Sequence, residues 1–417
     1  MAAELAKAVA DEPRDGEAFL PPGFFDFFPD LARDRDRFGP LLRRMETPLF
    51  LADTSSLVER YISLRRTLER LWGPSAIAYS FKTNYAVAES RVLQEKRAWA
   101  EVVSGREYRL ARRLGYAGRE TVFNGPYKRD DELRNALRDG ALIHVNDRPE
   151  LERLLTLLPP RPSGVRIGLR VNADPAGPEP SRFGLSLARG EAETAVARVA
   201  SVEGLELAGF HLHLKGDTDD PALYREAARE LARFVANMTP GGERPRLASL
   251  DLGGGFPAHG PKPRSRERWS PRPIDEYVRA ITGELARAFP GDSRPTLILE
   301  PGRYLVADAI VFVSETVRVE RDAGLQLVTG DGAVTMLPLT HYCPQVLRVF
   351  SRELELRVGA GEPTIVFGAS CRENDVLYRG LLPPTATGDY LVFYAAGAYN
   401  STLSPAFIFD APPVVFS

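Results

Sequence analysis

Between about residues 47 and 309, short apolar runs rich in β-branched residues alternate with longer stretches of helical periodicity. In Asp131–Asp139, Pro149–Leu158 and Pro221–Asn237, apolar residues recur every three or four positions. This alternation predicts parallel strands joined by crossover helices, and about eight runs are enough to close a (βα)8 barrel. The runs are Ile77–Asn84, Ala100–Ser104, Thr121–Gly125, Leu142–Asp147, Val165–Asn172, Leu207–Gly216, Leu247–Gly255 and Thr296–Gly302.

The pattern changes after about Ala309, where helical periodicity ends and short alternating strands follow. The predicted strands are Ile310–Val319, Leu325–Thr329, Leu347–Phe350, Leu354–Val358, Thr364–Phe367 and Asp389–Ala396. They indicate a second, all-β domain, whose sheet we expect the early run Thr47–Ala52 to join. The predicted boundaries are 1–46 for an N-terminal extension, 74–308 for the barrel, and 47–73 with 309–417 for the β domain.

Two segments stand apart from these patterns. The aromatic cluster Phe19–Pro29 lies in the N-terminal extension among charges of both signs, which favours a strap packed on the main body over a membrane wedge. The insertion from Pro257 to Pro273 is rich in Pro, Arg and Ser and predicts an exposed loop.

Composition and charge narrow the function classes. The chain has 417 residues, 44% hydrophobic and 26% charged, which is the balance of a soluble protein with a large core. Its net charge of −2 gives no global field that would attract nucleic acid or anionic lipid. No apolar run reaches the roughly 20 residues that span a membrane, and no secretory signal is evident, so we expect a cytoplasmic protein without membrane or nucleic-acid partners. Cys343 and Cys371 alone form neither a disulfide framework nor a structural zinc site.

Candidate chemistry begins at the end of the first predicted strand, where Lys82 follows an apolar run. Such a lysine is either an ordinary surface residue or a partly desolvated amine able to form a Schiff base. On the sixth predicted strand, His211 and His213 face the same side because they are two positions apart. No third ligand at a matching spacing is evident, so we predict no metal site and favour a ring stacked on a planar cofactor.

The last two predicted barrel strands also end in polar or glycine-rich motifs. Gly253–Gly255 follow the seventh strand, and glycines there let a backbone come close to an anion. Glu300, Gly302 and Arg303 follow the eighth strand. A carboxylate at that place can keep a ring nitrogen protonated and a Gly-Arg pair suits a phosphate, whereas the simpler alternative is an internal Glu–Arg ion pair. Because catalytic groups of such barrels stand at these strand ends, the motifs together predict a planar, phosphate-bearing cofactor attached to a lysine.

With these motifs the sequence resembles the fold-type III pyridoxal-phosphate decarboxylases, the family of the ornithine/arginine and diaminopimelate decarboxylases, over about residues 47 to 410. The resemblance implies an alanine racemase/ornithine decarboxylase-like fold, a (βα)8 TIM-like barrel with a C-terminal all-β domain, and a pyridoxal-phosphate-dependent carboxy-lyase activity. The motifs that carry it are Phe81–Asn84, Val103–Glu107, Arg182–Gly184, His211–His213, Asp251–Pro257, Glu300–Arg303, Cys371–Asp375 and Gly397–Tyr399.

The resemblance also implies roles for single residues. Lys82 would hold the cofactor covalently, His213 would stack on its ring, and Glu300 would pair with the ring nitrogen. The groups that would hold the phosphate are Gly253, Gly254, Gly255, Gly302, Arg303 and Tyr399. Cys371 would protonate the Cα carbanion, reaching the site from the neighbouring subunit of a head-to-tail homodimer; the alternative for this cysteine is an inert buried thiol.

The residues that the resemblance places near the substrate are Arg372, Glu373, Asp375, Tyr342 and Tyr399. Relatives acting on ornithine, lysine or diaminopimelate have an acidic residue at the position of Arg372, where it contacts the distal ammonium group. A cation there would repel that group, unless the loop is shifted by one residue and Glu373 supplies the acid. Pro338 stands where diaminopimelate decarboxylases place an arginine for the distal carboxylate. Gly216 replaces a phosphate-binding Ser, and Lys215 either offers its ammonium to the phosphate or points to solvent.

These departures favour an α-decarboxylase whose substrate lacks a distal ammonium, such as an acidic aminoacyl group tethered to an acyl carrier protein or a related conjugate in a specialised biosynthetic pathway. A carrier protein would then be a partner, docking on the basic residues Lys262, Arg264, Arg266 and Arg268. Two alternatives stay open. One is a decarboxylase of a free diamino acid (diaminopimelate, ornithine or lysine), and the other is a catalytically inactive relative that binds a protein partner.

Overall fold

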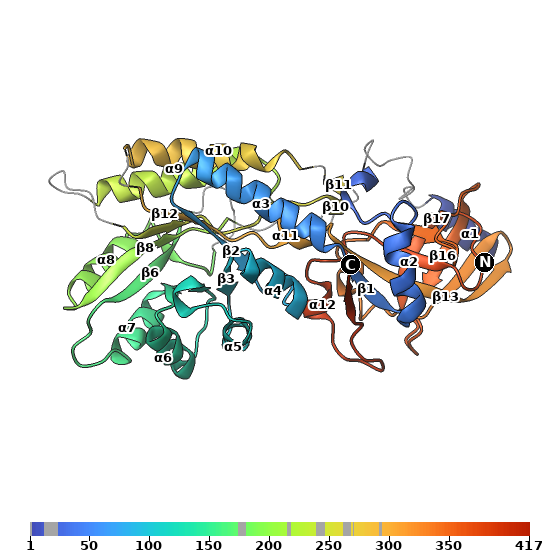
Figure 1. Cartoon of the computed structure of the whole chain (residues 1–417), viewed down its shortest axis with the longest axis horizontal. Helices are drawn as coiled ribbons and strands as arrows, with labels where there is room; N and C mark the ends of the chain where they lie inside the picture. Colours follow the sequence, from blue (N-terminus) through green and yellow to red (C-terminus); the bar gives the residue numbers. More distant parts are fainter. Residues whose placement is uncertain are drawn as a thin grey trace. The chain divides into compact units, whose positions relative to one another are not determined.

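The computed structural model describes residues 2–11, 24–173, 181–214, 218–238, 247–261, 268–269, 271–291 and 294–417 (Figure 1). The chain divides into two compact units. One, here called the barrel unit, comprises 58–256 and 272–302; the other, the β unit, comprises 1–57, 257–271 and 303–417. In the part of the chain that the structure describes, no helix is both long and apolar enough to cross a membrane.

The barrel unit contains a closed ring of parallel strands, as the alternating pattern predicts. The strands are β2 (Ser75–Ser80), β3 (Trp99–Val102), β4 (Thr121–Phe123), β5 (Leu142–Val145), β6 (Val165–Asn172), β8 (Leu205–His211), β9 (Ser249–Asp251) and β12 (Thr296–Leu299). Sequential neighbours pair in parallel, β12 pairs with β2, and β5 pairs with β6, which closes the ring. All eight predicted runs are therefore barrel strands, and the two-residue β7 (Leu185–Ser186) pairs in parallel with the end of β6.

Helix α3 precedes β2, the other helices follow the strands of this unit, and local capping explains where several begin. The helices are α3 (Thr54–Leu71), α4 (Val87–Glu95), α5 (Gly105–Arg113), α6 (Asp130–Asp139), α7 (Arg148–Thr156), α8 (Glu191–Ala200), α9 (Pro221–Asn237) and α10 (Ile274–Ala288). Ser104 begins α5 by accepting the N–H of Glu107, and Asp147 begins α7 by accepting the N–H of Glu150. The long helices α9 and α10 pack against each other (Figure 1). The short 3-10 turn η3 (Gly118–Glu120) precedes β4.

The β unit contains an eight-stranded sheet with the order β15-β18-β13-β14-β16-β17; β1 pairs with β13, and β19 pairs with β1. The strands are β1 (Leu49–Ala52), β13 (Ile310–Asp322), β14 (Leu325–Gly330), β15 (Leu347–Phe350), β16 (Glu362–Phe367), β17 (Val376–Leu382), β18 (Tyr390–Phe393) and β19 (Val414–Phe416). The expectation that Thr47–Ala52 joins this sheet is confirmed, since β1 pairs with β13. The predicted strand Leu354–Val358 is wrong: Leu354 has a φ of 63°, which interrupts an extended backbone, and only an isolated bridge joins this segment to Phe350.

The N-terminal segment is an integral part of the β unit. In α1 (Ala2–Asp11), Ala6 and Val9 pack against Leu325 and Ile365. The turn η2 (Phe24–Phe27) and helix α2 (Arg35–Arg44) contribute to a larger core. That core includes Phe24, Phe28, Leu31, Phe38, Leu42, Val313, Val392 and Tyr394. The aromatic cluster thus packs on the sheet, as the sequence predicts for its described part from residue 24 onward.

The units differ from the predicted domain boundaries in four segments. Residues 58–73 lie in the barrel unit, because α3 runs from β1 to β2 and Trp72 donates from Nε1 to the carbonyl of Pro295, just before β12, at 3.0 Å. Residues 1–46 and 303–308 lie in the β unit, together with 257–271. The predicted loop 257–273 contains a short antiparallel pair, β10 (Gly260–Pro261) with β11 (Arg268–Trp269).

Candidate active site

Lys82 lies directly beyond the C-terminal end of β2, with 32% of its side chain exposed. Its Nζ is 2.6 Å from Oε2 of Glu101, a buried carboxylate on β3, and 2.8 Å from Oγ of Ser80. Ser80 donates to the same carboxylate oxygen at 2.7 Å. The ends of two neighbouring strands therefore orient the amine at the C-terminal mouth of the barrel, where active sites of this architecture are built.

The glycine-rich turn follows β9 at the same mouth. Gly253 has a φ of 64°, and a Cβ at this position would lie 2.6 Å from Nδ1 of His213, so the turn can pass this ring only with glycine. The N–H of Gly253 donates to Oδ1 of Asp251 at 2.8 Å, and the N–H of Gly254 donates to Nδ1 of His213 at 3.3 Å. Gly255 also has a positive φ. The turn and the imidazole are thus one hydrogen-bonded arrangement.

His213 is an uncharged ring at neutral pH. Burial and the nearby Lys82 charge lower the pKa of His213 to about 3. Because Nδ1 accepts a hydrogen bond from Gly254, the neutral ring carries its proton on Nε2. The ring of His211 is stacked with it, with centroids 6.2 Å apart. A flat, neutral ring at the barrel mouth is suited to contact an aromatic cofactor.

Glu300 follows β12, and its buried carboxylate is held from two sides. Oε1 accepts a hydrogen bond from Nδ2 of Asn124 at 2.6 Å, and Oε2 lies 3.4 Å from Nε2 of His211. The same Asn124 amide donates to Oε1 of Glu101 at 3.1 Å. Asn124 therefore links the carboxylate next to Lys82 with the carboxylate of Glu300.

A second carboxyl group, Asp251, lies beside Glu300 in the barrel interior. Burial, with the charge of Glu300 and a side-chain hydrogen bond to it, raises the pKa of Asp251 well above its usual range. Burial lowers the pKa of His144 and His211 well below theirs, so both rings are neutral. Among the described residues, ligand atoms of His144, Asp251 and Glu300 lie within 4.8 Å of one another, as a metal ion would require. The absence of a metal site stays a prediction.

Several of these residues were not singled out in the sequence. Glu101, Asn124, His144 and Arg170 each lie in or directly after a barrel strand. Burial lowers the pKa of the Arg170 guanidinium, while the charges of nearby carboxylates, Glu300 first, oppose that shift. In the sequence, each of these four residues is a polar side chain in or next to an otherwise apolar predicted strand, and none belongs to the motifs that carry the family resemblance.

Of the predicted substrate residues, all but Tyr399 lie on two loops of the β unit. Cys371, Arg372 and Glu373 are exposed on the loop after β16. Arg372 donates from Nε to Oδ1 of Asn374 at 3.2 Å, and its guanidinium lies 6.0 Å from the ring centre of Phe407. Tyr342 is exposed directly after η4 (Pro338–His341).

Asp375 ends the Cys371 loop, and its carboxylate is buried. The carboxylate accepts the N–H of Val334 at 2.7 Å and the N–H of Ser370 at 2.9 Å. Both hydrogen bonds come from backbone N–H groups, and one of them, from Ser370, belongs to the loop that carries the thiol. The Asp375 carboxylate therefore orders this loop.

The other residues predicted to bind the phosphate belong to both units. Gly302 is buried in the barrel unit. In the β unit, the guanidinium of Arg303, at the start of α11 (Arg303–Val306), lies 5.6 Å from the ring centre of Tyr399. Tyr399 has a φ of 62° and precedes α12 (Asn400–Leu403). The residues named in the sequence analysis that lie outside the described part are Lys215, Gly216, Lys262, Arg264 and Arg266.

Comparison with known proteins identifies the family. The family described as "Pyridoxal-dependent decarboxylase, pyridoxal binding domain" matches residues 54–307, more than half of the chain. The diaminopimelate decarboxylase of Methanothermobacter thermautotrophicus is 30% identical over 371 residues, covering 86% of this chain and 83% of that protein. The diaminopimelate decarboxylase of Actinosynnema pretiosum is 28% identical over 99% of this chain and 94% of its own.

Solved structures agree on the fold. Diaminopimelate decarboxylase from M. jannaschii in complex with L-lysine has a TM-score of 0.78 at 22% identity, covering 91% of this chain and 89% of that one. Lysine/ornithine decarboxylase from Vibrio vulnificus complexed with putrescine has a TM-score of 0.76 at 21% identity, covering 93% and 98%. SrLDC in complex with PLP and cadaverine has a TM-score of 0.75 at 22% identity, covering 91% and 93%.

These relatives overturn the preference for a substrate tethered to a carrier protein, which is wrong. They are named diaminopimelate decarboxylases, after a diamino acid, and a carrier protein occurs in none of these names. The preference rested on departures from the family pattern, chiefly the charge of Arg372 and the presence of Pro338 where diaminopimelate decarboxylases place an arginine. A charge read from one sequence position does not say which group it faces.

The residues at the barrel mouth fit pyridoxal phosphate. Lys82 offers an amine, Gly253 opens a backbone turn that a Cβ would block, His213 offers a neutral ring, and Glu300 offers a buried carboxylate. This donor set matches the aldehyde, phosphate and pyridine ring of that cofactor. The chain therefore belongs to the fold-type III pyridoxal-phosphate-dependent decarboxylases, and it is a carboxy-lyase that uses this cofactor.

Proposed function

We propose that this enzyme removes the α-carboxylate of a free diamino acid, with diaminopimelate as the first candidate. The observation that carries the proposal is the 30% identity to a diaminopimelate decarboxylase over most of both chains. A free diamino acid is one of the alternatives that the sequence left open. We keep a cytoplasmic location and a role in biosynthesis as predictions.

The charges on the Cys371 loop favour diaminopimelate over lysine and ornithine. The distal end of diaminopimelate carries an ammonium and a carboxylate, whereas the distal ends of lysine and ornithine carry an ammonium alone. Arg372 and Glu373 are adjacent, exposed and of opposite charge. Such a pair complements a distal group that bears both charges, so the repulsion expected from Arg372 is offset by its attraction for the second carboxylate.

At the barrel mouth, each residue would have a distinct task. Bound pyridoxal phosphate supplies an electron sink for the electron pair that remains when carbon dioxide leaves. Lys82, oriented by Glu101 and Ser80, would bind the cofactor covalently. Glu300 would hold a proton at the ring nitrogen, and neutral His213 would cover one face of the ring without adding a charge.

The proton that replaces the carboxylate on Cα would come from Sγ of Cys371. This thiol is exposed on a loop ordered by the buried Asp375 carboxylate. In the family that the sequence resembles, the matching cysteine reaches the site from the neighbouring subunit. A homodimer with shared active sites is therefore part of the proposal.

Carbon dioxide release by the purified, cofactor-loaded enzyme tests the substrate. We expect the highest kcat/KM for diaminopimelate, with lysine, ornithine and arginine well below it and no release by Lys82→Ala. Arg372→Ala should raise KM for diaminopimelate about tenfold and should not raise KM for lysine, because only diaminopimelate has the distal carboxylate and lysine would lose only a repulsion. A higher kcat/KM for lysine or ornithine would contradict the substrate assignment. Normal cofactor absorption and carbon dioxide release in Lys82→Ala would contradict the assignment of the catalytic lysine.

A further inference from the structure

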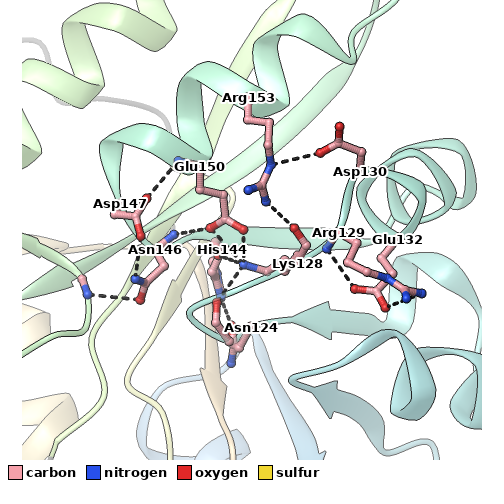
Figure 2. Close-up of polar contacts among 12 residues, drawn as sticks. Asn124, Lys128, Arg129, Asp130, Glu132, His144, Asn146, Asp147, Glu150 and Arg153 are labelled. Carbon is pink, nitrogen blue, oxygen red and sulfur yellow. Dashed lines mark hydrogen bonds and ion pairs between the residues drawn. The ribbon is translucent and has the colours of Figure 1, made fainter.

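Lys128 and Glu150 form a buried ion pair beside the ends of β4 and β5 (Figure 2). Lys128 is wholly buried, Glu150 on α7 is almost so, and Nζ lies 3.0 Å from Oε1. Taking two charges out of water is costly, and well-packed apolar residues are often as stable in their place. The contacts of this pair indicate what it does for the neighbouring site.

The ammonium of Lys128 joins the ends of two adjacent strands. Besides Glu150, it donates to the carbonyl of Gly125 at 3.0 Å, just after β4, and to the carbonyl of His144 at 2.9 Å, within β5. Its three N–H donors thus have three partners. Glu150 in turn accepts the N–H of Asn146 at 2.7 Å, directly after β5. Figure 2 shows the Lys128 ammonium between these groups.

The carbonyl of Gly125 is available to Lys128 because the backbone turns sharply there. Gly125 has a φ of 98°, and a Cβ would lie 2.6 Å from the carbonyl oxygen of Val103. The preceding residue, Asn124, donates its N–H to the carbonyl of Val102 at 2.8 Å. Asn124 is therefore fixed by β3 on one side and by the Lys128-bound turn on the other.

Two side chains lead from this fixed backbone to the site. Nδ1 of His144 lies 2.8 Å from Oδ1 of Asn124, and Nδ2 of Asn124 donates to Glu300 at 2.6 Å. Burial lowers the pKa of His144 well below its usual range, and the charge of Lys128 adds to this effect. The neutral ring donates its Nδ1 proton to Asn124, which orients the amide toward the carboxylate.

We propose that Lys128 and Glu150 are positioning residues for Glu300: the pair holds the ends of β4 and β5 so that Asn124 and His144 aim the Glu300 carboxylate at the cofactor's ring nitrogen. The proposal rests on the role given to Glu300 under the proposed function. The proposal predicts an effect on the contact between Glu300 and the ring nitrogen only. An experiment can therefore distinguish this effect from a general loss of folding.

The test compares two cofactors in the full-length enzyme: pyridoxal phosphate, and an analogue in which C–H replaces the ring nitrogen. The double variant Lys128→Met with Glu150→Leu removes both charges at similar volume. We expect its Kd for pyridoxal phosphate, measured by fluorescence quenching, to rise about tenfold, since a hydrogen bond to a charged group is lost or misaligned. The Kd for the analogue should stay within twofold of wild type. An equal rise for both cofactors, or no rise for either, would overturn the proposal.

Two further variants keep the outcome interpretable. Asn124→Ala removes the link to Glu300 without touching the ion pair, and it provides the test if the double variant does not fold. Because it also removes the 3.1 Å bond to Glu101, we expect some loss for both cofactors and a clearly larger loss for pyridoxal phosphate than for the analogue. Glu152→Gln changes an exposed carboxylate on the same helix, paired with Arg198 at 3.0 Å, and should bind both cofactors as wild type does.

Glu300→Gln separates this proposal from the assignment on which it rests. Selective weakening of pyridoxal phosphate binding by this variant, with no effect of the double variant or of Asn124→Ala, would refute the positioning role alone. Equal weakening of both cofactors by Glu300→Gln would show that Glu300 is not the partner of the ring nitrogen, and the role assigned under the proposed function would fail.

Discussion

Glu89 gives the protein a pH-dependent stability that one substitution removes. It lies in the first turn of α4 and is 3% exposed. Within the described residues, neither carboxylate oxygen has a partner from another residue. Burial raises the pKa of Glu89 to about 7 from an ordinary value of 4.5. The substitution Glu89→Gln keeps the shape of the side chain and removes the titration.

The direction in which stability changes with pH follows from proton binding. The folded protein holds the Glu89 proton more tightly than the unfolded chain does, so wild type loses stability as the pH rises from about 4.5 to about 7. Above that range the whole cost of a buried charge is present, which amounts to about 3 kcal/mol for this change of pKa. We therefore expect Glu89→Gln to match wild type near pH 4.5 and to exceed it in free energy of unfolding by up to about 3 kcal/mol at pH 8.

Urea unfolding followed by circular dichroism at pH 5, 6, 7 and 8 measures this difference. Glu107 also has a pKa raised to about 7 by burial, but it is present in both proteins and cancels from their difference. Glu95→Gln, an exposed position at the end of the same helix, is the matched control and should show no pH-dependent gain. A gain for Glu89→Gln that is the same at pH 5 and pH 8, or a loss that grows with pH, would refute the reasoning.

Two further predictions concern the β unit and the dimer. Phe28→Ala should destabilise the protein by about 3–5 kcal/mol, because its ring is buried against Phe24 and Tyr394 with centroids 5.1 and 5.3 Å away; thermal unfolding unchanged by this variant would show that the N-terminal segment does not contribute to the core. Mixing inactive Lys82→Ala with inactive Cys371→Ala should restore about a quarter of wild-type carbon dioxide release, because random pairing of subunits leaves one intact shared site in half of the dimers. Failure of a confirmed mixed dimer to regain activity would place both residues of a site in one subunit.

The sequence by itself determined the elements and the edge at which the chemistry gathers. Hydrophobic periodicity is a local property, so the barrel strands and the helices α6, α7 and α9 could be read from it. Because the strands of a closed parallel barrel share one C-terminal mouth, Lys82, His213 and Glu300 could be assigned to a common site before any contact was known. The strands β17 and β19 were missed, and their place in the sheet depends on pairing with β16 and β1.

Only the tertiary structure decided which groups face one another. Asn124 and Glu300 are 176 positions apart, and their hydrogen bond exists because the ring of strands brings β4 and β12 to one interior. The buried pair of Lys128 and Glu150 likewise depends on the packing of α7 beside β5. The substrate prediction that relied on Arg372 was wrong for the same reason, because the charge at one sequence position does not show which group the side chain faces. Side-chain partners, burial and the resulting pKa shifts are properties of three-dimensional neighbours, which a local pattern does not contain.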